Sequence, residues 1–278
     1  MSRNGSPLFC GGDMAARIEE AEASAIVAAT EVAMARGSGG FVRGVGGGTA
    51  CFAETGSPLN KVVGVGFGGV PSVGEWEAVE EAYARVGCPV QVELAQLAEP
   101  GIAEGLTGRG YRLMSFENVL GMRLDGGEWA VPEGVEVRLD AGDDLDAWLD
   151  VVVDGFAYPD EGPVHEEFPR AAIAAVMRDM ASVGETRRYL AYRDGVAAGG
   201  ASVRIDGGIA ALAGAATLLA HRRRGVQTAL LATRLADAAR AGCELATVTT
   251  APGSKSQQNA QSQGFSLLYT RAILVKDH

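Results

Sequence analysis

The stretch that decides the fold runs from Ile209 to Leu231 and reads IAALAGAATLLAHRRRGVQTALL. Its apolar beginning, Ile209–Leu218, predicts a buried strand, and the segment from Gly225 to Ala241 predicts a helix with one apolar face. Between them lie three consecutive arginines, Arg222 to Arg224. A strand, a glycine-bearing turn and a helix start bring unpaired backbone N–H groups together, and the helix dipole adds positive potential. The sequence therefore predicts that this turn binds phosphate groups.

The turn carries neither of two widespread nucleotide-binding motifs. It lacks GxxxxGK[ST], and it lacks GxGxxG followed by an acidic residue about 20 positions on. A glycine repeat does occur earlier in the chain, as Gly64-Val65-Gly66-Phe67-Gly68-Gly69, but a tight strand or a bulge accounts for it. A protein specialised for ATP is therefore disfavoured.

The segments around the turn alternate between strand and helix patterns. Apolar periodicity and turn residues such as Asp194-Gly195 and Asp206-Gly207-Gly208 set the boundaries. The expected order is strand 135–139, a helix from Asp143-Asp144 to Phe156, a polar loop 157–169, helix 170–183, strands 187–193, 196–205 and 209–218, helix 225–241, strand 245–250, a short helix 256–263 and strand 265–275.

The first half of the chain ends in a similar succession of elements. Here the pattern predicts a helix over 76–86, a strand over 90–94, a helix over 97–106 and a strand over 110–124. The resemblance of the two tails indicates a duplicated unit, and chance similarity is the alternative. We expect a first domain over 1–125, a turn-rich linker over 126–134 and a second domain over 135–278.

Composition narrows the classes of function. The 278 residues are 47% hydrophobic, which suffices for one large core or two ordinary ones. The formal net charge of −11 disfavours a nucleic-acid partner, because phosphate backbones require a basic footprint. The four cysteines form no CxxC, the three histidines show no metal-ligand spacing, and no apolar run is long enough for a membrane span. We therefore expect a cytoplasmic protein without a metal.

The arginine turn resembles the acyl-CoA loop of the GNAT superfamily of N-acetyltransferases. The family signature is Gln/Arg-x-x-Gly-x-Gly/Ala, and this chain has Arg222-x-x-Gly225-x-Gln227. The likeness extends over about Val135 to Val275 and includes a last helix that closes with Gly264-Phe265. It implies an α/β (α+β) fold with a mixed, mostly antiparallel sheet flanked by helices, here duplicated. Gln227 departs from the usual glycine or alanine, which implies an altered phosphate geometry.

The resemblance implies that acetyl-CoA binds the second half. In the family, the fourth and fifth strands splay apart, pantetheine lies between them, and backbone N–H groups hold its arm. The coenzyme-binding residues implied here are Thr217, Leu218, Leu219, Arg222, Arg223, Arg224, Gly225, Val226, Gln227, Thr228 and Ala229, with Ser256 and Asn259 on the last helix. For Ser256 and Asn259, helix capping and solvent exposure are an equal alternative.

The groups that would transfer protons are not evident from the sequence. Many family members carry a carboxylate on the fourth strand, and Ile209–Thr217 has none. Many also carry a tyrosine five positions before the phenylalanine of Gly-Phe, where this chain has Ala260. Glu161 and His165, in the acidic loop beside the family's acceptor pocket, are candidate bases, although an ordinary solvated loop is the alternative. Tyr269 faces either the core or the thiol.

The resulting expectation is an acetyl-CoA-dependent N-acetyltransferase that acts on a small primary amine by direct transfer in a ternary complex. The alternative is a catalytically inert acyl-CoA-binding or regulatory module. The first half places Pro71 and Glu75 where a phosphate would lie, so we expect it to bind no coenzyme. Neither nucleic acid nor membrane is expected as a partner, and the protein is expected to be a monomer or a homodimer.

Overall fold

The computed structural model describes residues 8–125, 127–140, 144–157 and 169–277. Within these ranges the helices are α1 (Gly12–Ala35), α2 (Val73–Arg85), α3 (Gly101–Gly108), α4 (Leu145–Ala157), α5 (Arg170–Ala181), α6 (Val226–Arg240) and α7 (Lys255–Ser262). The strands are β1 (Phe41–Val45), β2 (Gly48–Phe52), β3 (Lys61–Val63), β4 (Val90–Ala95), β5 (Arg112–Arg123), β6 (Glu136–Leu139), β7 (Thr186–Arg193), β8 (Val196–Asp206), β9 (Ile209–Thr217), β10 (Leu245–Thr250) and β11 (Ser266–Lys276). No helix in this part of the chain is both long and apolar enough to cross a bilayer.

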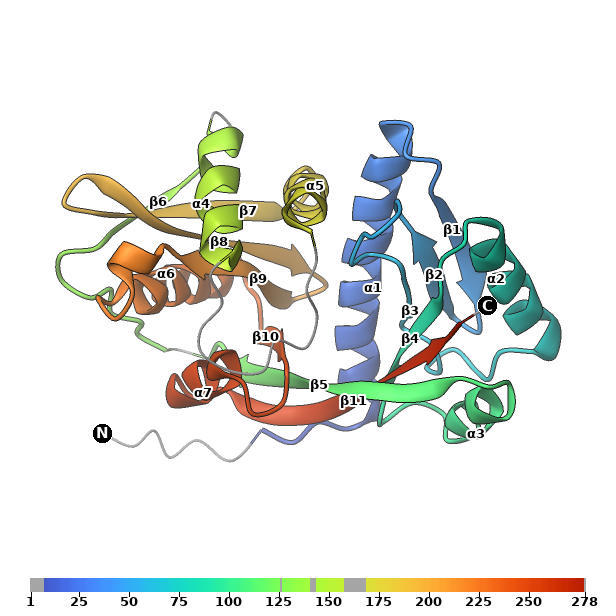
Figure 1. Cartoon of the computed structure of the whole chain (residues 1–278). Coiled ribbons are helices and arrows are strands. Elements are labelled where there is room, and N and C mark those ends of the chain that lie inside the picture. Colours follow the sequence, from blue (N-terminus) through green and yellow to red (C-terminus); the bar gives the residue numbers. More distant parts are fainter. Residues whose placement is uncertain (1–7, 126, 141–143, 158–168, 278) are drawn as a thin grey trace.

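The strands form one sheet in the order β1-β2-β3-β4-β11-β5-β10-β9-β8-β7-β6 (Figure 1). Neighbouring strands run antiparallel except for two pairs, β3 with β4 and β9 with β10. The predicted fold class, a mixed and mostly antiparallel sheet flanked by helices, is therefore confirmed.

The two sequence halves exchange their last strands. β5, which ends the first half, pairs with β10 of the second half, and β11, which ends the chain, pairs with β4 of the first half. β5 and β11 also pair with each other at the centre of the sheet, where Ser266 faces Gly121 and Val275 faces Arg112. This reciprocal arrangement is what a duplicated unit would produce, and the domain boundaries expected from the sequence stay a prediction.

Helices cover both faces of the second half of the sheet. Along β7, Leu190 packs with α4 residues such as Trp148, whereas its neighbours Tyr189 and Ala191 pack with α6 residues such as Leu230. Successive side chains of a strand point to opposite faces, so α4 and α6 lie on opposite sides of the sheet. The middle of β7, Tyr189–Ala191, is therefore shielded from water on both faces.

The predicted elements are confirmed with small shifts at their ends. Helix α2 begins at Val73, three residues earlier than expected, because Ser72 and Glu75 form a reciprocal capping box. Helix α3 begins only at Gly101, because Pro100 disfavours a helical conformation at the residue before it. The glycines at 64–69 form turns after β3 rather than a strand. The sequence analysis assigned no element to α1 or to β1–β3.

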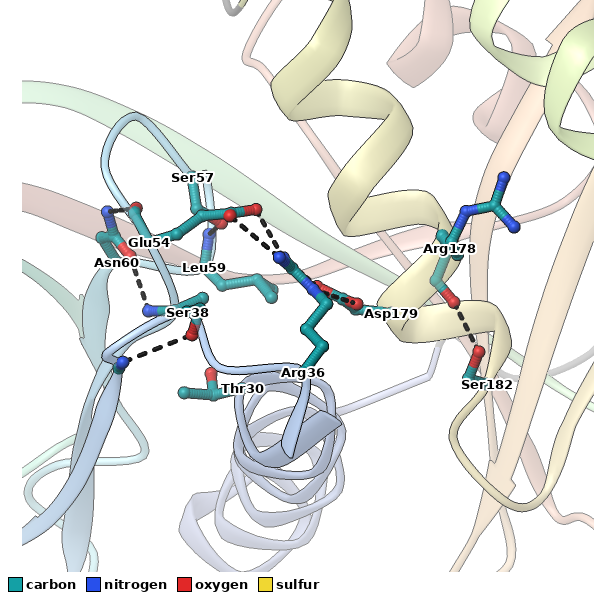
Figure 2. Close-up of polar contacts among 12 residues, drawn as sticks. Thr30, Arg36, Ser38, Glu54, Ser57, Leu59, Asn60, Arg178, Asp179 and Ser182 are labelled. Atoms are coloured by element: carbon teal, nitrogen blue, oxygen red, sulfur yellow. Dashed lines mark hydrogen bonds and ion pairs between the residues drawn. The ribbon is translucent and has the colours of Figure 1, made fainter. Parts of the chain in front are cut away.

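Helix α1 connects the two halves of the molecule (Figure 1). Its Ala-rich side packs against β2 and α5. The buried Thr30 hydroxyl donates to the Ile26 carbonyl of the same helix at 2.8 Å. At its C-terminal end, Arg36 lies between Glu54 and Asp179 and binds both carboxylates (Figure 2). Asp179 belongs to α5 and is buried, so this contact ties the second half to the first.

Replacing Arg36 by alanine is expected to lower the free energy of unfolding by about 2 kcal/mol. The buried Asp179 would lose its 3.0 Å ion pair, and an unpaired buried charge typically costs about 3–5 kcal/mol, reduced here because Arg36 is partly exposed. Chemical denaturation measures the change. Arg85→Ala, which removes an exposed pair with Glu81, serves as the control and should cost less than about 0.5 kcal/mol. Equal losses for both variants would contradict the assignment.

Candidate coenzyme site

The coenzyme loop, defined as Arg222–Ala229, has an unusual backbone. Gly225, the N-cap of α6, has φ 80°, and Arg223 has φ 60°, a left-handed conformation that non-glycine residues seldom adopt. No described side chain caps this helix. The N–H groups of the first helical turn have no partner within the helix, so they are available to an anion.

The three arginines of the loop take different positions. Arg222 is half-buried and donates to the carbonyls of Thr217 and Gly155, each at 3.4 Å, so it joins the end of β9 to α4. Arg223 and Arg224 are exposed. Arg193 of β7 donates to the Arg224 carbonyl at 3.0 Å and thereby attaches the loop to the sheet. The side chains of Arg223 and Arg224 are thus solvent-exposed beside the start of α6, which no described side chain caps.

Helix α7 approaches the start of α6. Asn259 Nδ2 donates to Gln227 Oε1 at 3.3 Å, so the structure brings together two of the predicted coenzyme residues. Ser256 lies on the exposed side of α7, and the cap of this helix is Ser254, whose hydroxyl accepts from the Gln257 amide. Ala260, which stands where many family members have a tyrosine, is buried in the core.

Strands β9 and β10 diverge in the direction of the coenzyme loop. They pair in parallel only from Leu245–Ile209 to Thr247–Ala211, although both strands continue beyond this point. The residues past the divergence are Leu212–Thr217 on β9 and Val248–Thr250 on β10. The expected splay is present, and it leads from the middle of the sheet towards Arg222–Ala229.

A β-bulge and a buried arginine shape β9 beside this divergence. The register with β8 shifts between Gly200 and Ser202, and Gly214 opposite them has φ 59°. Arg234 of α6 is buried and donates to the carbonyls of Ser202, at 2.9 Å, and Ala213. Burial lowers the pKa of Arg234 to about 10. Bulges redirect backbone groups next to active sites, and Arg234 holds this one in place.

One amide assigned to pantetheine is engaged elsewhere. The Leu218 N–H donates to the Ala198 carbonyl of β8 at 3.0 Å, so it faces away from β10. Thr217 pairs with Gly199 on the same side, and Leu219 begins a short 3-10 helix, Leu219–His221, with an exposed side chain. His221 has a buried Nδ1 without a hydrogen-bond partner among the described residues.

The three predicted catalytic residues have different outcomes. Glu161 and His165 lie outside the described residues. Tyr269 is buried, and its hydroxyl donates to Glu19 of α1 at 2.6 Å. Burial and the Glu19 charge raise the pKa of Tyr269 well above its ordinary value. Its hydroxyl is held within the core between α1 and β11, and its role in transfer stays a prediction.

Sequence reasoning missed a cluster of charged side chains between α1 and the centre of the sheet. We call it the acidic cluster: Glu19 and Glu22 of α1, Lys61 of β3, Glu93 of β4, Glu117 of β5 and Arg271 of β11. Five of its six members come from the first half of the chain. Their signal in the sequence was a glutamate inside an apolar strand, as at Glu93 in Val90–Ala95.

The corresponding helix start in the first half already holds an anion. Glu75 accepts from the backbone N–H groups of Gly46, at 3.1 Å, and Ser72, at 2.7 Å. The Ser72 hydroxyl, which also donates to Glu75, and these two backbone hydrogen bonds hold the pKa of Glu75 below its ordinary value. A phosphate there would displace or oppose this carboxylate, in contrast to the uncapped start of α6.

Comparisons with known proteins agree with this geometry. Residues 151–265 match the model of the acetyltransferase (GNAT) family. A GCN5-related N-acetyltransferase from Kribbella flavida has a TM-score of 0.67 and 22% identity, covering 95% of this chain and 96% of that one. A tandem GNAT protein from the clavulanic acid biosynthesis pathway has a TM-score of 0.61 and 16% identity, covering 97% of both chains. No curated protein matches the sequence.

At these identities the structural likeness establishes the fold, and the family model identifies the domain that spans the coenzyme loop. Residues 151–265, which contain the coenzyme loop, match the acetyltransferase (GNAT) family, and the chain shares its fold with the GCN5-related and tandem GNAT structures. The resemblance seen in Arg222-x-x-Gly225-x-Gln227 is thereby confirmed.

Proposed function

We propose that the protein is an acetyl-CoA-dependent N-acetyltransferase that acts on a small primary amine by direct transfer in a ternary complex. The observation that carries the proposal is the uncapped start of α6, flanked by Arg223 and Arg224, at the open end of the β9–β10 divergence. When bound, acetyl-CoA supplies an activated acyl thioester. The site is cationic on a chain of net charge −11, as an anionic coenzyme requires.

The chain's own groups have distinct tasks in this proposal. The amides of Val226–Thr228 bind the pyrophosphate, and Arg223 and Arg224 add charge. Gln227 of α6 and Asn259 of α7, joined by a hydrogen bond, border the pantetheine. Backbone groups of β9 on the side that faces β10 hold the pantetheine arm, since the Leu218 amide is engaged with β8. Groups so placed polarise the thioester carbonyl.

The arginine contribution is tested by charge reversal. Arg224→Glu is expected to weaken coenzyme A binding about 30-fold, because it replaces an attraction to phosphate by a repulsion. Isothermal titration calorimetry gives the affinity, and thiol release from acetyl-CoA across a panel of amines gives turnover. Arg85→Glu, an equal charge change on exposed α2, should leave both unchanged. Unaltered affinity in Arg224→Glu would contradict the proposed phosphate site.

A catalytically inert acyl-CoA-binding module is the second candidate. One observation favours it: β9 has no carboxylate, whereas many members of the family carry one on the corresponding strand. Turnover separates the two. Coenzyme binding without acetylation of any amine in the panel would support the module, and thiol release that depends on an amine would support the enzyme.

We further propose that residues 1–125 form a degenerate GNAT-like domain without a coenzyme site, that 126–134 link the domains and that 135–278 bind acetyl-CoA. Support comes from Glu75, which supplies at α2 the anion that the coenzyme would supply at α6. The tandem GNAT protein with which this chain aligns over its full length is consistent with this arrangement. A cytoplasmic location and a monomeric or homodimeric state complete the proposal.

A further inference from the structure

The acidic cluster lies next to the β9–β10 divergence. Thr249 of β10 faces Val119 of β5, which in turn faces Tyr269 of β11, and Glu117 faces Arg271 in the same ladder. Cross-strand partners share a face of the sheet, and so do residues two apart on one strand. Thr249 and Glu117 therefore lie on the same face, and Thr249 is just past the last β9–β10 pair.

Helix α1 packs over this face of the sheet, and its Glu19 and Glu22 contact β11. Its Glu22 accepts a hydrogen bond from Arg271 of β11 at 2.6 Å, and the neighbouring Thr249 side chain of β10 helps to lower the pKa of the same carboxylate. Glu22 and Glu117 retain side-chain exposures of 27% and 32%, whereas Glu19, Glu93 and Arg271 retain at most 3%. The partly exposed carboxylates of Glu22 and Glu117 are thus the members of the acidic cluster that a ligand could reach from solvent.

Two fully buried atoms behind Glu117 have no hydrogen-bond partner among the described residues. They are Arg271 Nη1 and Glu93 Oε2. Arg271 Nη1 lies 3.8 Å from Glu93 Oε2 and 3.9 Å from Glu117 Oε2, too far for a direct hydrogen bond. Buried polar atoms are as a rule hydrogen-bonded, and these two are not paired with any described side chain. The network is therefore built to interact with something besides its own side chains.

The excess of negative charge in the acidic cluster favours binding of a cation beside Glu22 and Glu117. Four carboxylates, Glu19, Glu22, Glu93 and Glu117, share two cations, Lys61 and Arg271. Burial and the neighbouring Glu93 raise the pKa of Glu117 to about 7. Burial also raises the pKa of Glu22, but Arg271 more than offsets this and leaves that pKa below its ordinary value. At neutral pH, Glu22 is ionised, and Glu117 is populated in both its protonated and its ionised form.

We propose that Glu22 and Glu117, both from the first half of the chain, receive the ammonium group of the acceptor and that Glu117 is the catalytic base. The inference rests on the proposed N-acetyltransferase function. It assigns the missing base to β5, the strand that the first half donates to the second half's sheet. The acceptor class that fits two carboxylates is a cationic primary amine.

The step balances without a further reactant. Glu117 takes one proton from the ammonium group, which leaves a neutral amine with a free electron pair. The amine nitrogen forms a bond to the acyl carbon, the carbon–sulfur bond breaks, and the second nitrogen proton passes to the departing thiolate. The products are the amide and the free thiol, and Glu117 returns its proton to the solvent.

The test is Glu117→Gln in the full chain, assayed with putrescine, lysine, kanamycin and a glycyl peptide as acceptors. Wild-type kcat/KM is expected to rise through a pKa near 7 and then to level off. Glu117→Gln should lower kcat/KM at pH 7 about 100-fold or more and should replace this limb by a rise that continues to the amine's own pKa. Glu117→Asp should retain the limb at a reduced rate.

Two further measurements separate a catalytic from a structural role. Coenzyme A affinity and thermal stability should match wild type in Glu117→Gln, and the control Glu20→Gln, on the exposed side of α1, should behave as wild type throughout. In ¹³C NMR of labelled glutamate, the resonance lost in Glu117→Gln should titrate near pH 7. An unchanged pH profile, or titration of Glu117 below pH 5, overturns this inference alone. Failure of wild type to bind coenzyme A or to acetylate any acceptor overturns the proposed function as well.

Discussion

Replacing Arg271 by methionine is expected to cost about 4 kcal/mol of unfolding free energy. Arg271 is 1% exposed and binds Glu19 at 2.7 Å and Glu22 at 2.6 Å. Methionine fills much of the same volume but leaves these carboxylates without their cation. Removing one partner of a buried ion pair typically costs about 3–5 kcal/mol, because a buried charge stays uncompensated.

The loss should depend on pH in a defined direction. The pKa of Glu22 lies below its ordinary value of 4.5, so its ionised form contributes stability above that pH and loses the contribution as the pH falls through the folded-state value. The difference between wild type and Arg271→Met should therefore be largest near neutrality and smaller in acid. Urea unfolding at several pH values measures it. Arg112→Met on β5, which removes an exposed pair with Asp277, is the control and should change stability by less than about 0.5 kcal/mol.

Replacing Gly225 by valine is expected to weaken coenzyme A binding about 100-fold. At φ 80° a β-branched side chain costs roughly 1–3 kcal/mol of backbone strain, and its Cβ would lie 3.1 Å from Pro132 Cβ. The loop must move to relieve both, and the first-turn amides of α6 move with it. Since these amides are the proposed pyrophosphate ligands, the affinity should fall.

Gly242→Val provides a matched control for this variant. Gly242 follows the opposite end of α6 with φ 84°, and a Cβ there meets no atom within 4 Å. It should therefore reproduce the backbone strain without affecting the loop. Calorimetric titration of coenzyme A compares the three proteins. If Gly242→Val and Gly225→Val bind equally well, the coenzyme does not contact the start of α6.

The sequence predicts the second half well because its signals are local. Apolar periodicity, paired turn residues and a glycine at the helix start each act within a few residues, and the elements from β6 to β11 appear in the expected order. The coenzyme loop is likewise a contiguous motif. In the first half, the start of α2 shifted to Val73 because a side-chain cap moved the boundary.

The rest depends on contacts between distant residues. The exchange of β5 and β11 follows from pairing across more than half the chain, which no local pattern encodes. The acidic cluster needs that exchange, since Glu117 and Arg271 become neighbours only once the strands lie side by side. The candidate bases Glu161 and His165 follow α4 and stay a prediction, whereas five of the six residues of the acidic cluster come from the first half of the chain.

The exchange of β5 and β11 also determines which fragments of the chain can fold by themselves. A fragment that starts at β6 would expose the edge of β10, because β5 would be gone, and it would leave β11 without β4. Unpaired edges of this kind promote aggregation. By contrast, a cut between β5 and β6 leaves every strand neighbour in place, so two separately made pieces should reassemble by mutual complementation. The segment that matches the family, residues 151–265, is therefore expected to be shorter than the shortest stretch that folds.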